Sequence, residues 1–163
     1  MSVRLLICLL AVALSVNIAE AGEIVLTQDS YGAIKFGSRI IDVEKNLEEK
    51  AKSDSGEVGC DFVQFRKYPK ASFMVEDGII TRVDIHGDTP NVLGISVGTS
   101  LASIKKKYPR VLIKPHHYDP TGQYLIFKNR TDGKAIVMEV GKGKVTDIRA
   151  GLLPSVEYVE GCL

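Results

Sequence analysis

The sequence repeats one pattern twice, and this repeat constrains the fold more than any other feature. Each copy has an apolar residue, a glycine, a hydroxyl residue and then a short amphipathic run, at residues 35–43 and again at residues 96–104. Ser38 in the first copy, and Thr99 or Ser100 in the second, are placed to cap a helix. Apolar residues follow at i, i+3 and i+7, the spacing of one helix face. They are Ile40, Val43 and Leu47 in the first copy, and Leu101, Ile104 and Tyr108 in the second.

Each copy ends in a predicted β-hairpin. Residues 73–85 centre on Asp77-Gly78, a pair that supplies the positive φ of a tight turn, and residues 138–150 place Gly143 at the matching position. Further strand-like runs precede the hairpins at residues 62–66, 114–118, 123–128 and 134–140. The alternation along the last strands predicts inward-facing side chains at Thr81, Val83, Ile85, Thr146, Ile148 and Ala150.

The repeat predicts an α+β fold made of two tandem modules. Each module is a short helix followed by an antiparallel meander of three or four strands. Residues 22–86 form the first module, residues 87–93 the linker, and residues 94–163 the second module with its C-terminal tail. Because a unit of about 60 residues buries little core alone, we expect the two modules to pack together.

Residues 1–21 have the pattern of a secretory signal peptide. Arg4 supplies the positive charge, residues 5–16 are apolar, and residues 19–21 (Ala-Glu-Ala) form a small-x-small cleavage site. The apolar run of 12 residues is too short to cross about 30 Å of hydrocarbon as a helix. We therefore expect a mature chain that starts at Gly22, is periplasmic or secreted, and has no stable membrane anchor.

Cys60 and Cys162 remain after Cys8 leaves with the leader. An even pair of cysteines in an oxidising compartment predicts a disulfide, which would tie the C-terminal tail to the first module. The alternative is a reactive thiol. That chemistry needs a CxxC motif or a basic neighbour, and neither cysteine has one.

The net charge of +1 conceals an asymmetry between the two halves. Residues 22–86 carry 9 Lys and Arg against 12 Asp and Glu, and residues 87–163 carry 11 against 7, so the halves have net charges of −3 and +4. The near-neutral total argues against a nucleic-acid binder. Charged helix faces are usually solvated surfaces, and the alternative is a dipolar surface that steers a charged partner. The basic cluster consists of Lys105, Lys106, Lys107, Arg110 and Lys114, and the first helix exposes Asp42, Glu44, Glu48 and Glu49.

Six residues are candidates for contacts with a partner. Four charged residues occupy the outward faces of the last strands of the two modules, with the order of sign reversed between them. If these strands abut around a pseudo-twofold axis, the four form cross-strand ion pairs; if they line an open sheet face, they recognise a partner. Two tyrosines flank the turn at residues 119–122 and offer both area and a hydroxyl. The six are Arg82, Asp84, Asp147, Arg149, Tyr118 and Tyr124.

No sequence pattern indicates catalysis, a metal or a cofactor. His116-His117 is the only histidine cluster, and adjacent residues of a strand point to opposite faces, so the ligands of a zinc site are missing. The sequence also lacks GxxxxGK[ST] and GxGxxG motifs. We expect a protein that is not an enzyme and needs no cofactor.

A helix introduced by glycine and a hydroxyl residue, then a short antiparallel sheet, repeated in tandem, resembles the module of two groups of proteins. These are the small outer-membrane assembly lipoproteins of the SmpA/OmlA type and the β-lactamase inhibitory proteins. Residues 73–78, 94–98, 117–124, 149–151 and 156–162 are more closely similar to an uncharacterised family of exported Gram-negative bacterial proteins, over nearly the whole mature chain. The module resemblance implies protein-binding relatives, and the family resemblance implies no activity or site residue. The chain departs from the lipoproteins because it lacks their lipidated cysteine.

The sequence therefore predicts a periplasmic, non-enzymatic protein-binding module of the inhibitor or envelope-assembly adaptor type. Its expected partner is another envelope protein. The alternative is a binding protein for cell-wall glycan or peptide that uses the tyrosines and the basic second module. An unrecognised hydrolase is the third hypothesis.

Overall fold

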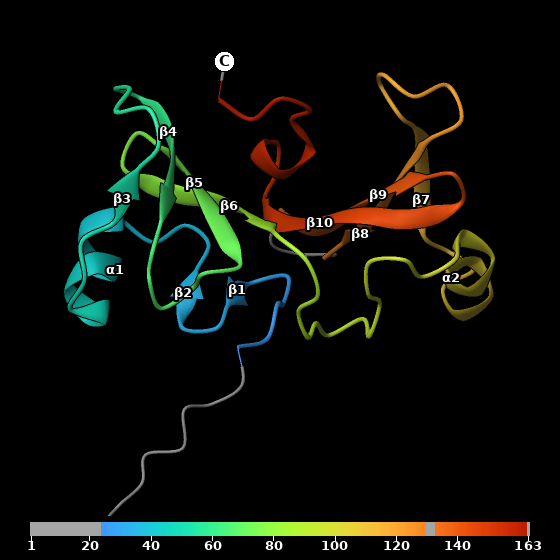
Figure 1. The fold of residues 1–163 in the computed structure, drawn as a ribbon, viewed down its shortest axis with the longest axis horizontal. Helices are drawn as coiled ribbons and strands as arrows, with labels where there is room; N and C mark the ends of the chain where they lie inside the picture. Colours follow the sequence, from blue (N-terminus) through green and yellow to red (C-terminus); the bar gives the residue numbers. More distant parts are fainter. Residues whose placement is uncertain (1–23, 130–132, 163) are drawn as a thin grey trace, which may run out of the picture.

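The computed structural model describes residues 24–129 and 133–162, so the predicted signal peptide lies outside the described residues. One antiparallel sheet of eight strands forms the body of the protein (Figure 1). Across the sheet the order is β3 (Lys52–Ser53), β4 (Cys60–Gln64), β5 (Ala71–Glu76), β6 (Ile79–Ile85), β10 (Lys144–Leu152), β9 (Lys134–Gly141), β8 (Gln123–Lys128) and β7 (Leu112–Pro115).

The predicted fold class, two tandem modules that each combine a helix with a meander, is wrong. Strands β6 and β10 end the two predicted meanders, and they pair with each other over residues 82–85 and 148–151. The last strand of an isolated meander would leave a row of N–H and C=O groups unpaired, and joining two such edges satisfies both. The result is one continuous sheet, and the described part of the chain is mostly β, with two α-helices of 8 and 7 residues.

Helices α1 (Ile40–Leu47) and α2 (Leu101–Lys107) lie at opposite ends of one face of the sheet (Figure 1). Their predicted apolar stripes are confirmed, since Val43, Leu47 and Ile104 are buried in the main core and the other stripe residues pack against it. The capping prediction holds for one helix. Ser100 accepts a hydrogen bond from the N–H of Ser103 at 3.2 Å, whereas α1 begins after Arg39 without a side-chain cap.

Both helices begin beside a tight turn of the sheet. The first helical N–H donates to the carbonyl oxygen of the turn glycine at 2.8 Å in the first half and 2.9 Å in the second. Both turns have two consecutive residues with positive φ, a conformation that glycine adopts without strain. These residues are Asp77 (φ 48°) and Gly78 (φ 79°) between β5 and β6, and Lys142 (φ 48°) and Gly143 (φ 73°) between β9 and β10.

The N-terminal segment fills the centre of the same face. It forms a two-stranded hairpin of β1 (Ser30–Tyr31) and β2 (Ile34–Lys35), located between the two helices (Figure 1). The N–H of Leu26 also donates to the carbonyl oxygen of Pro90 at 2.8 Å, which joins this segment to the predicted linker. The segment buries Leu26, Tyr31, Ile34 and Phe36 in the main core.

The opposite face of the sheet is covered in its middle by residues 153–162, which we call the tail (Figure 1). The tail contains a 3₁₀ turn, η1 (Ser155–Glu157), and its Val156 is fully buried in a second apolar cluster with Ile126 and Val137. The predicted disulfide is confirmed. It joins Cys60 to Cys162 with the two Cα atoms 5.5 Å apart. Disulfides persist in oxidising compartments, so the bridge fits a secreted protein.

The predicted inward alternation is correct in part. Val83, Ile85, Ile148 and Ala150 are buried in the main core, and Thr81 is also buried. Thr146 is exposed instead, because the register shifts between Val145 and Asp147 and turns Val145 into the core. Within residues 24–129 and 133–162, no helix is long and apolar enough to cross a membrane.

Candidate functional site

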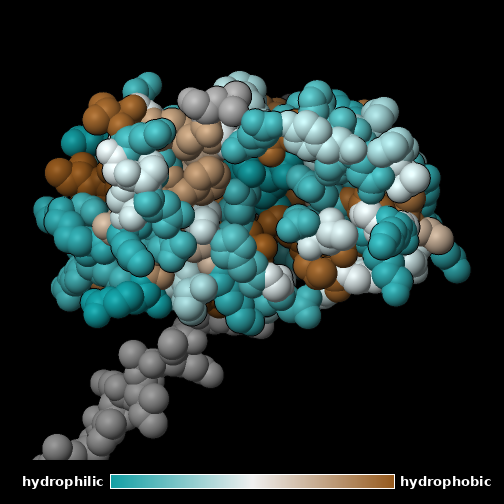
Figure 2. Space-filling view, turned by 45° about the horizontal axis from the view of Figure 1, so that its top comes forward, coloured by the Kyte–Doolittle hydropathy of each residue, from teal (hydrophilic) through white to brown (hydrophobic). Residues whose placement is uncertain are grey.

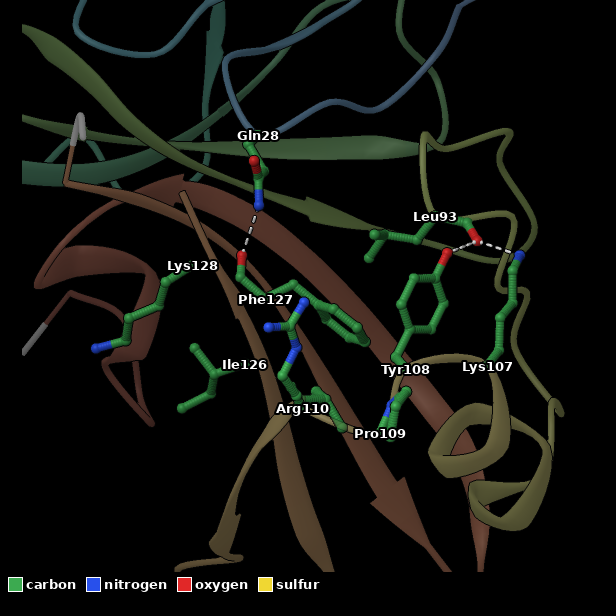
Figure 3. A pocket seen from close by; sticks show the side chains of 10 residues that line it. Gln28, Leu93, Lys107, Tyr108, Pro109, Arg110, Ile126, Phe127 and Lys128 are labelled. Carbon is green, nitrogen blue, oxygen red and sulfur yellow. Dashed lines mark hydrogen bonds between the residues drawn. The ribbon is translucent and has the colours of Figure 1, made fainter. Parts of the chain in front are cut away.

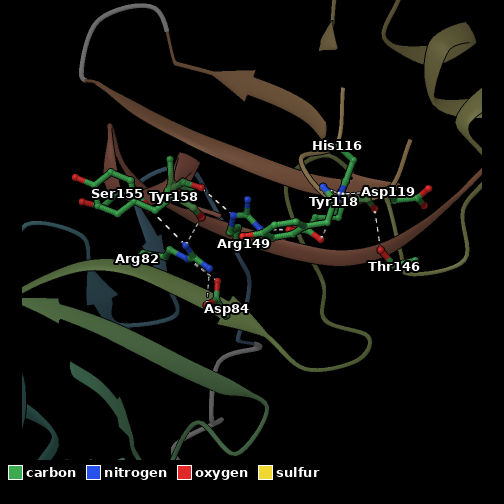
Figure 4. Close-up of polar contacts among 11 residues, drawn as sticks. Arg82, Asp84, His116, Tyr118, Asp119, Thr146, Arg149, Ser155 and Tyr158 are labelled. Atoms are coloured by element: carbon green, nitrogen blue, oxygen red, sulfur yellow. Dashed lines mark hydrogen bonds and ion pairs between the residues drawn. The ribbon is translucent and has the colours of Figure 1, made fainter. Parts of the chain in front are cut away.

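Arg82, one of the predicted contact residues, lies beneath the tail and is only 5% exposed. Its Nε and Nη2 donate to the two carboxylate oxygens of Asp84 at 2.7 and 2.9 Å (Figure 4). Its Nη1 donates to the carbonyl oxygen of Tyr158 at 2.8 Å. A paired guanidinium with its donors satisfied tolerates burial. Arg82 therefore holds the tail against β6.

Arg149 holds the tail in the second half, and it too is 5% exposed. Its Nε donates to the carbonyl oxygen of Val156 at 2.8 Å, and its Nη1 donates to the carboxylate of Glu139 on β9. Burial raises the pKa of the Glu139 carboxyl, but the hydrogen bonds from Arg149 and His116 and the charge of Arg149 outweigh burial and hold this pKa below its usual value. Glu139 is therefore the counter-ion of the buried guanidinium.

His116 completes this group. Its Nδ1 accepts the backbone N–H groups of Tyr118 and Asp119 at 3.1 and 3.0 Å, so its proton lies on Nε2. Nε2 lies 3.2 Å from Oε2 of Glu139 and donates to it. Both ring nitrogens of His116 are thus engaged in hydrogen bonds within the chain.

The charged candidates do not form the cross-strand pairs expected among themselves. Arg82 pairs with Asp84 along one strand, and Arg149 pairs with Glu139, which the sequence did not identify. Asp147 is exposed and makes no ion pair with any residue that the structure describes. The structure therefore covers Arg82 and Arg149 with the tail of the same chain.

The two candidate tyrosines lie in different environments. Tyr118 is 61% exposed on the loop between β7 and β8. Tyr124 is 7% exposed, and its ring stacks on His116 with centroids 4.6 Å apart. The guanidinium carbon of Arg149 lies 5.5 Å from the centre of the Tyr124 ring. Tyr118 is free to touch a partner surface, whereas Tyr124 reaches only a ligand that enters beneath the tail.

A pocket of about 390 Å³ opens at the end of α2, just before β7 begins opposite Ile126, so that Phe127 and Lys128 of β8 have no β7 partner (Figure 3). We call it the basic groove. Its exposed cations come from the α2 end and from β8, and its apolar surface comes from partly or fully buried side chains. It is defined by the cations Lys107, Arg110 and Lys128 and the apolar residues Tyr108, Ile126 and Phe127.

Contacts between separate segments fix the walls of the basic groove. The Tyr108 hydroxyl and Nζ of Lys107 both donate to the carbonyl oxygen of Leu93, at 2.6 and 2.8 Å. The Tyr108 ring meets Phe127 edge to face with centroids 5.3 Å apart. Nε2 of Gln28 donates to the carbonyl oxygen of Phe127 at 2.8 Å. The groove is therefore built before any ligand arrives.

The groove carries a positive charge that is not fully neutralised. In Figure 3, Arg110 extends its guanidinium into the groove, and it has no ion pair or hydrogen bond with any described residue. Lys128 pairs with Glu157 at 3.0 Å. Burial raises the pKa of the Glu157 carboxyl, but Lys114 and Lys128 outweigh burial and hold this pKa below its usual value. The groove therefore suits an anionic group attached to an apolar body.

The face of the molecule shown in Figure 2 is mostly hydrophilic, with separate apolar patches. The described residues contain no group of three His, Cys, Asp or Glu that could hold a metal ion. Sequence reasoning identified Lys107 and Arg110 as exposed cations but assigned Tyr108 to the helix stripe. The groove is built from four segments that are distant in the sequence. The only local sign of it was the stretch Lys107-Tyr108-Pro109-Arg110, in which an aromatic residue and a proline lie between two cations.

No family model and no curated protein matches the chain. Among solved structures, the chain is similar to an extracellular protein containing a SCP domain from Bacillus anthracis str. Ames, with 10% sequence identity and a TM-score of 0.42. The similarity covers 72% of this chain and 44% of that one, so the chain spans less than half the length of that protein. A likeness of this strength does not assign a function.

Proposed function

We propose that the chain is a periplasmic, non-enzymatic protein-binding module of the inhibitor or envelope-assembly adaptor type. Its basic groove would receive an acidic segment of another envelope protein. The disulfide and the signal-like pattern of residues 1–21 support export. The net charge of +4 on residues 87–163 would steer an acidic partner toward the groove.

Arg110 is the observation that carries this proposal. A guanidinium offers paired donors that match a carboxylate, and Arg110 has no described partner of its own. Beside it lie Tyr108 and Phe127, whose rings supply apolar contact area. Interfaces concentrate binding energy in such combinations of arginine and aromatic residues. Pockets of about 300–1,000 Å³ hold small ligands, so the groove admits a few side chains of an extended segment.

Substituting Arg110→Glu tests the groove. The side chain is exposed and unpaired among the described residues, so the variant should fold normally and lose the captured partner. Lys105→Glu is the matched control, because it makes the same charge change on exposed α2 outside the groove. Each mature protein would be used to capture proteins from its own periplasmic extract, and the captured protein would then be purified and titrated.

We expect Arg110→Glu to weaken the purified complex by about tenfold or more, and Lys105→Glu to change it little. The wild-type complex should also weaken as salt rises, because salt screens attraction between exposed charges. If all three proteins capture the same partners with the same affinity, the basic groove is not the binding surface.

A cell-wall glycan or peptide is the second candidate ligand. The combination of aromatic rings and cations in the groove, together with the exposed ring of Tyr118, favours it. Sedimentation with purified peptidoglycan separates the two proposals. If the wild type sediments with peptidoglycan and Arg110→Glu stays in solution, the result would support the cell-wall ligand. If the wild type stays in solution, the result would favour the protein partner.

A further inference from the structure

A second pocket, of about 170 Å³, lies between the tail and the sheet. The sheet contributes Tyr124 and Arg149, the edge strand β7 contributes Lys114, and the tail contributes Glu157. We call it the tail pocket. Ile126 lines both this pocket and the basic groove, so the two adjoin, but none of the groove cations lines the tail pocket.

Tyr124 gives the first indication of a ligand. Tyr124 is only 7% exposed, and its hydroxyl has no hydrogen-bond partner among the residues that the structure describes. Buried polar groups are nearly always paired, since burying one without a partner is costly. The other predicted tyrosine, Tyr118, has no such need because it is exposed. A polar group that enters the tail pocket would satisfy the Tyr124 hydroxyl.

The charges around the pocket indicate the sign of that ligand. Arg149 uses Nε and Nη1 in contacts with the chain, but its Nη2 makes no hydrogen bond to any described residue. Lys114 lies 2.9 Å from Glu157, which also pairs with Lys128 at 3.0 Å. Glu157 is thus shared between two lysines, and Glu139 balances Arg149, so one lysine charge has no counter-ion among these groups. An acceptor with negative charge fits this surplus of donors.

The rest of the lining indicates the body of the ligand. Ile126 and Val137 from the sheet and Val159 from the tail provide an apolar wall opposite the polar groups. At about 30 Å³ for each water molecule in the liquid, the volume equals that of roughly six waters. A short aliphatic chain that ends in a carboxylate has this size and this division of polar and apolar surface.

We propose that the tail pocket binds a small aliphatic carboxylate, which accepts hydrogen bonds from the Tyr124 hydroxyl and from Nη2 of Arg149. The carboxylate belongs either to a free organic acid or to the C-terminus of a peptide. In both cases the buried hydroxyl gains its missing partner, and Lys114 adds attraction at the mouth of the pocket.

Butyrate is the probe for the free acid, and butyramide is its neutral control with the same shape. Alanyl-alanine and its C-terminal amide test the peptide terminus in the same way. Each would be titrated into the full mature chain, with binding followed by NMR chemical shifts and by calorimetry. We expect saturable binding of at least one acid. The affinity for the matching amide should be lower by about tenfold or more.

Tyr124→Phe keeps the ring that stacks on His116 and removes only the hydroxyl. We expect this variant to keep the wild-type melting temperature or exceed it, and to bind the acid about tenfold more weakly. Tyr118→Phe, the same change on an exposed tyrosine, should bind like the wild type.

Saturable binding of butyrate would show that a free organic acid is enough to occupy the tail pocket. Tighter binding of the dipeptide than of butyrate would show that the pocket prefers the C-terminus of a peptide. Three results would overturn the tail pocket: no saturable binding of any probe, equal binding of acids and amides, or equal binding by Tyr124→Phe and the wild type. Arg110→Glu should bind the acid normally, so this inference and the proposed function fail separately.

Discussion

Asp61 organises the loop between β3 and β4. Its carboxylate accepts hydrogen bonds from the hydroxyls of Ser53 and Ser55 and from the backbone N–H groups of Ser55 and Gly56. The hydrogen bond from Ser53 is the largest cause of a lowered pKa. With the other donors it outweighs the opposing effect of burial, and the pKa of Asp61 falls to about 2. Val58, at the tip of this loop, is fully exposed.

The pKa of Asp61 predicts a dependence of stability on pH. An unfolded aspartate titrates near pH ~3.9. Because the folded pKa is lower, the ionised carboxylate stabilises the fold above pH ~4, and this contribution is lost as the pH falls toward about 2. We expect Asp61→Asn to reduce the free energy of unfolding by about 1 kcal/mol or less near neutral pH, since solvent screens this loop. Urea unfolding of Asp61→Asn and the wild type near neutral pH and at pH ~2 measures the difference.

Asp54→Asn is the control for this prediction. Asp54 lies in the same loop, but its carboxylate accepts one long hydrogen bond, from Gln64 at 3.4 Å. The control should therefore change stability little at either pH. A loss in Asp61→Asn that stays the same from neutral pH to pH ~2 would contradict the assigned role of the ionised carboxylate.

The two helices offer a direct comparison at the level of secondary structure. Ser100 caps α2 by accepting a hydrogen bond from Ser103, whereas Ser38 makes no side-chain cap on α1. We expect Ser100→Ala to lower the free energy of unfolding by about 1 kcal/mol, because the N–H of Ser103 loses its acceptor. Ser38→Ala should have a much smaller effect. Urea unfolding of both variants measures the difference, and equal losses would exclude capping as the cause.

Local patterns were sufficient to predict most elements. The i, i+3, i+7 spacing of Ile40, Val43 and Leu47 located α1, and Asp77-Gly78 located the turn between β5 and β6. The pairing of β6 with β10 was missed because Ile85 and Ile148, which face each other, are far apart in the sequence and carry no local signal of contact. Strands of two residues, such as β1 and β3, are too short to show an alternation.

The candidate site was predictable only where residues act alone. Arg149 was placed correctly on the outward side of its strand, yet it is buried because the tail crosses that side. The tail has no regular apolar spacing that would reveal its position. Glu139, the partner of Arg149, becomes its neighbour only through the register of β9 with β10. Contacts of this kind require the sheet order, which a single sequence does not supply.

The whole molecule depends on the junction between β6 and β10. At this junction the two halves, whose net charges are −3 and +4, share one sheet. The disulfide adds a second connection, since Cys60 lies on β4 in the first half and Cys162 in the tail, 102 residues later. Two connections between the halves imply that they unfold together.

Gly151 is the residue that allows the two strands to meet. It pairs with Arg82 across the junction, and a Cβ atom at this position would lie 2.2 Å from the carbonyl oxygen of Thr81 and 2.7 Å from Cα of Arg82. Both contacts are with backbone atoms, which cannot move aside without opening the sheet. At Gly141, on β9, an added Cβ would meet only side chains, those of Thr146 at 3.3 Å and Asp119 at 4.0 Å.

We therefore expect Gly151→Ala to lower the free energy of unfolding by about 3 kcal/mol, and Gly141→Ala to lower it by much less. The chain has no tryptophan, so urea unfolding would be followed by tyrosine fluorescence and by far-ultraviolet circular dichroism. If the halves form one cooperative unit, both signals shift together to a lower urea concentration. A wild-type midpoint, or two separate transitions, would show that the junction does not hold the halves together.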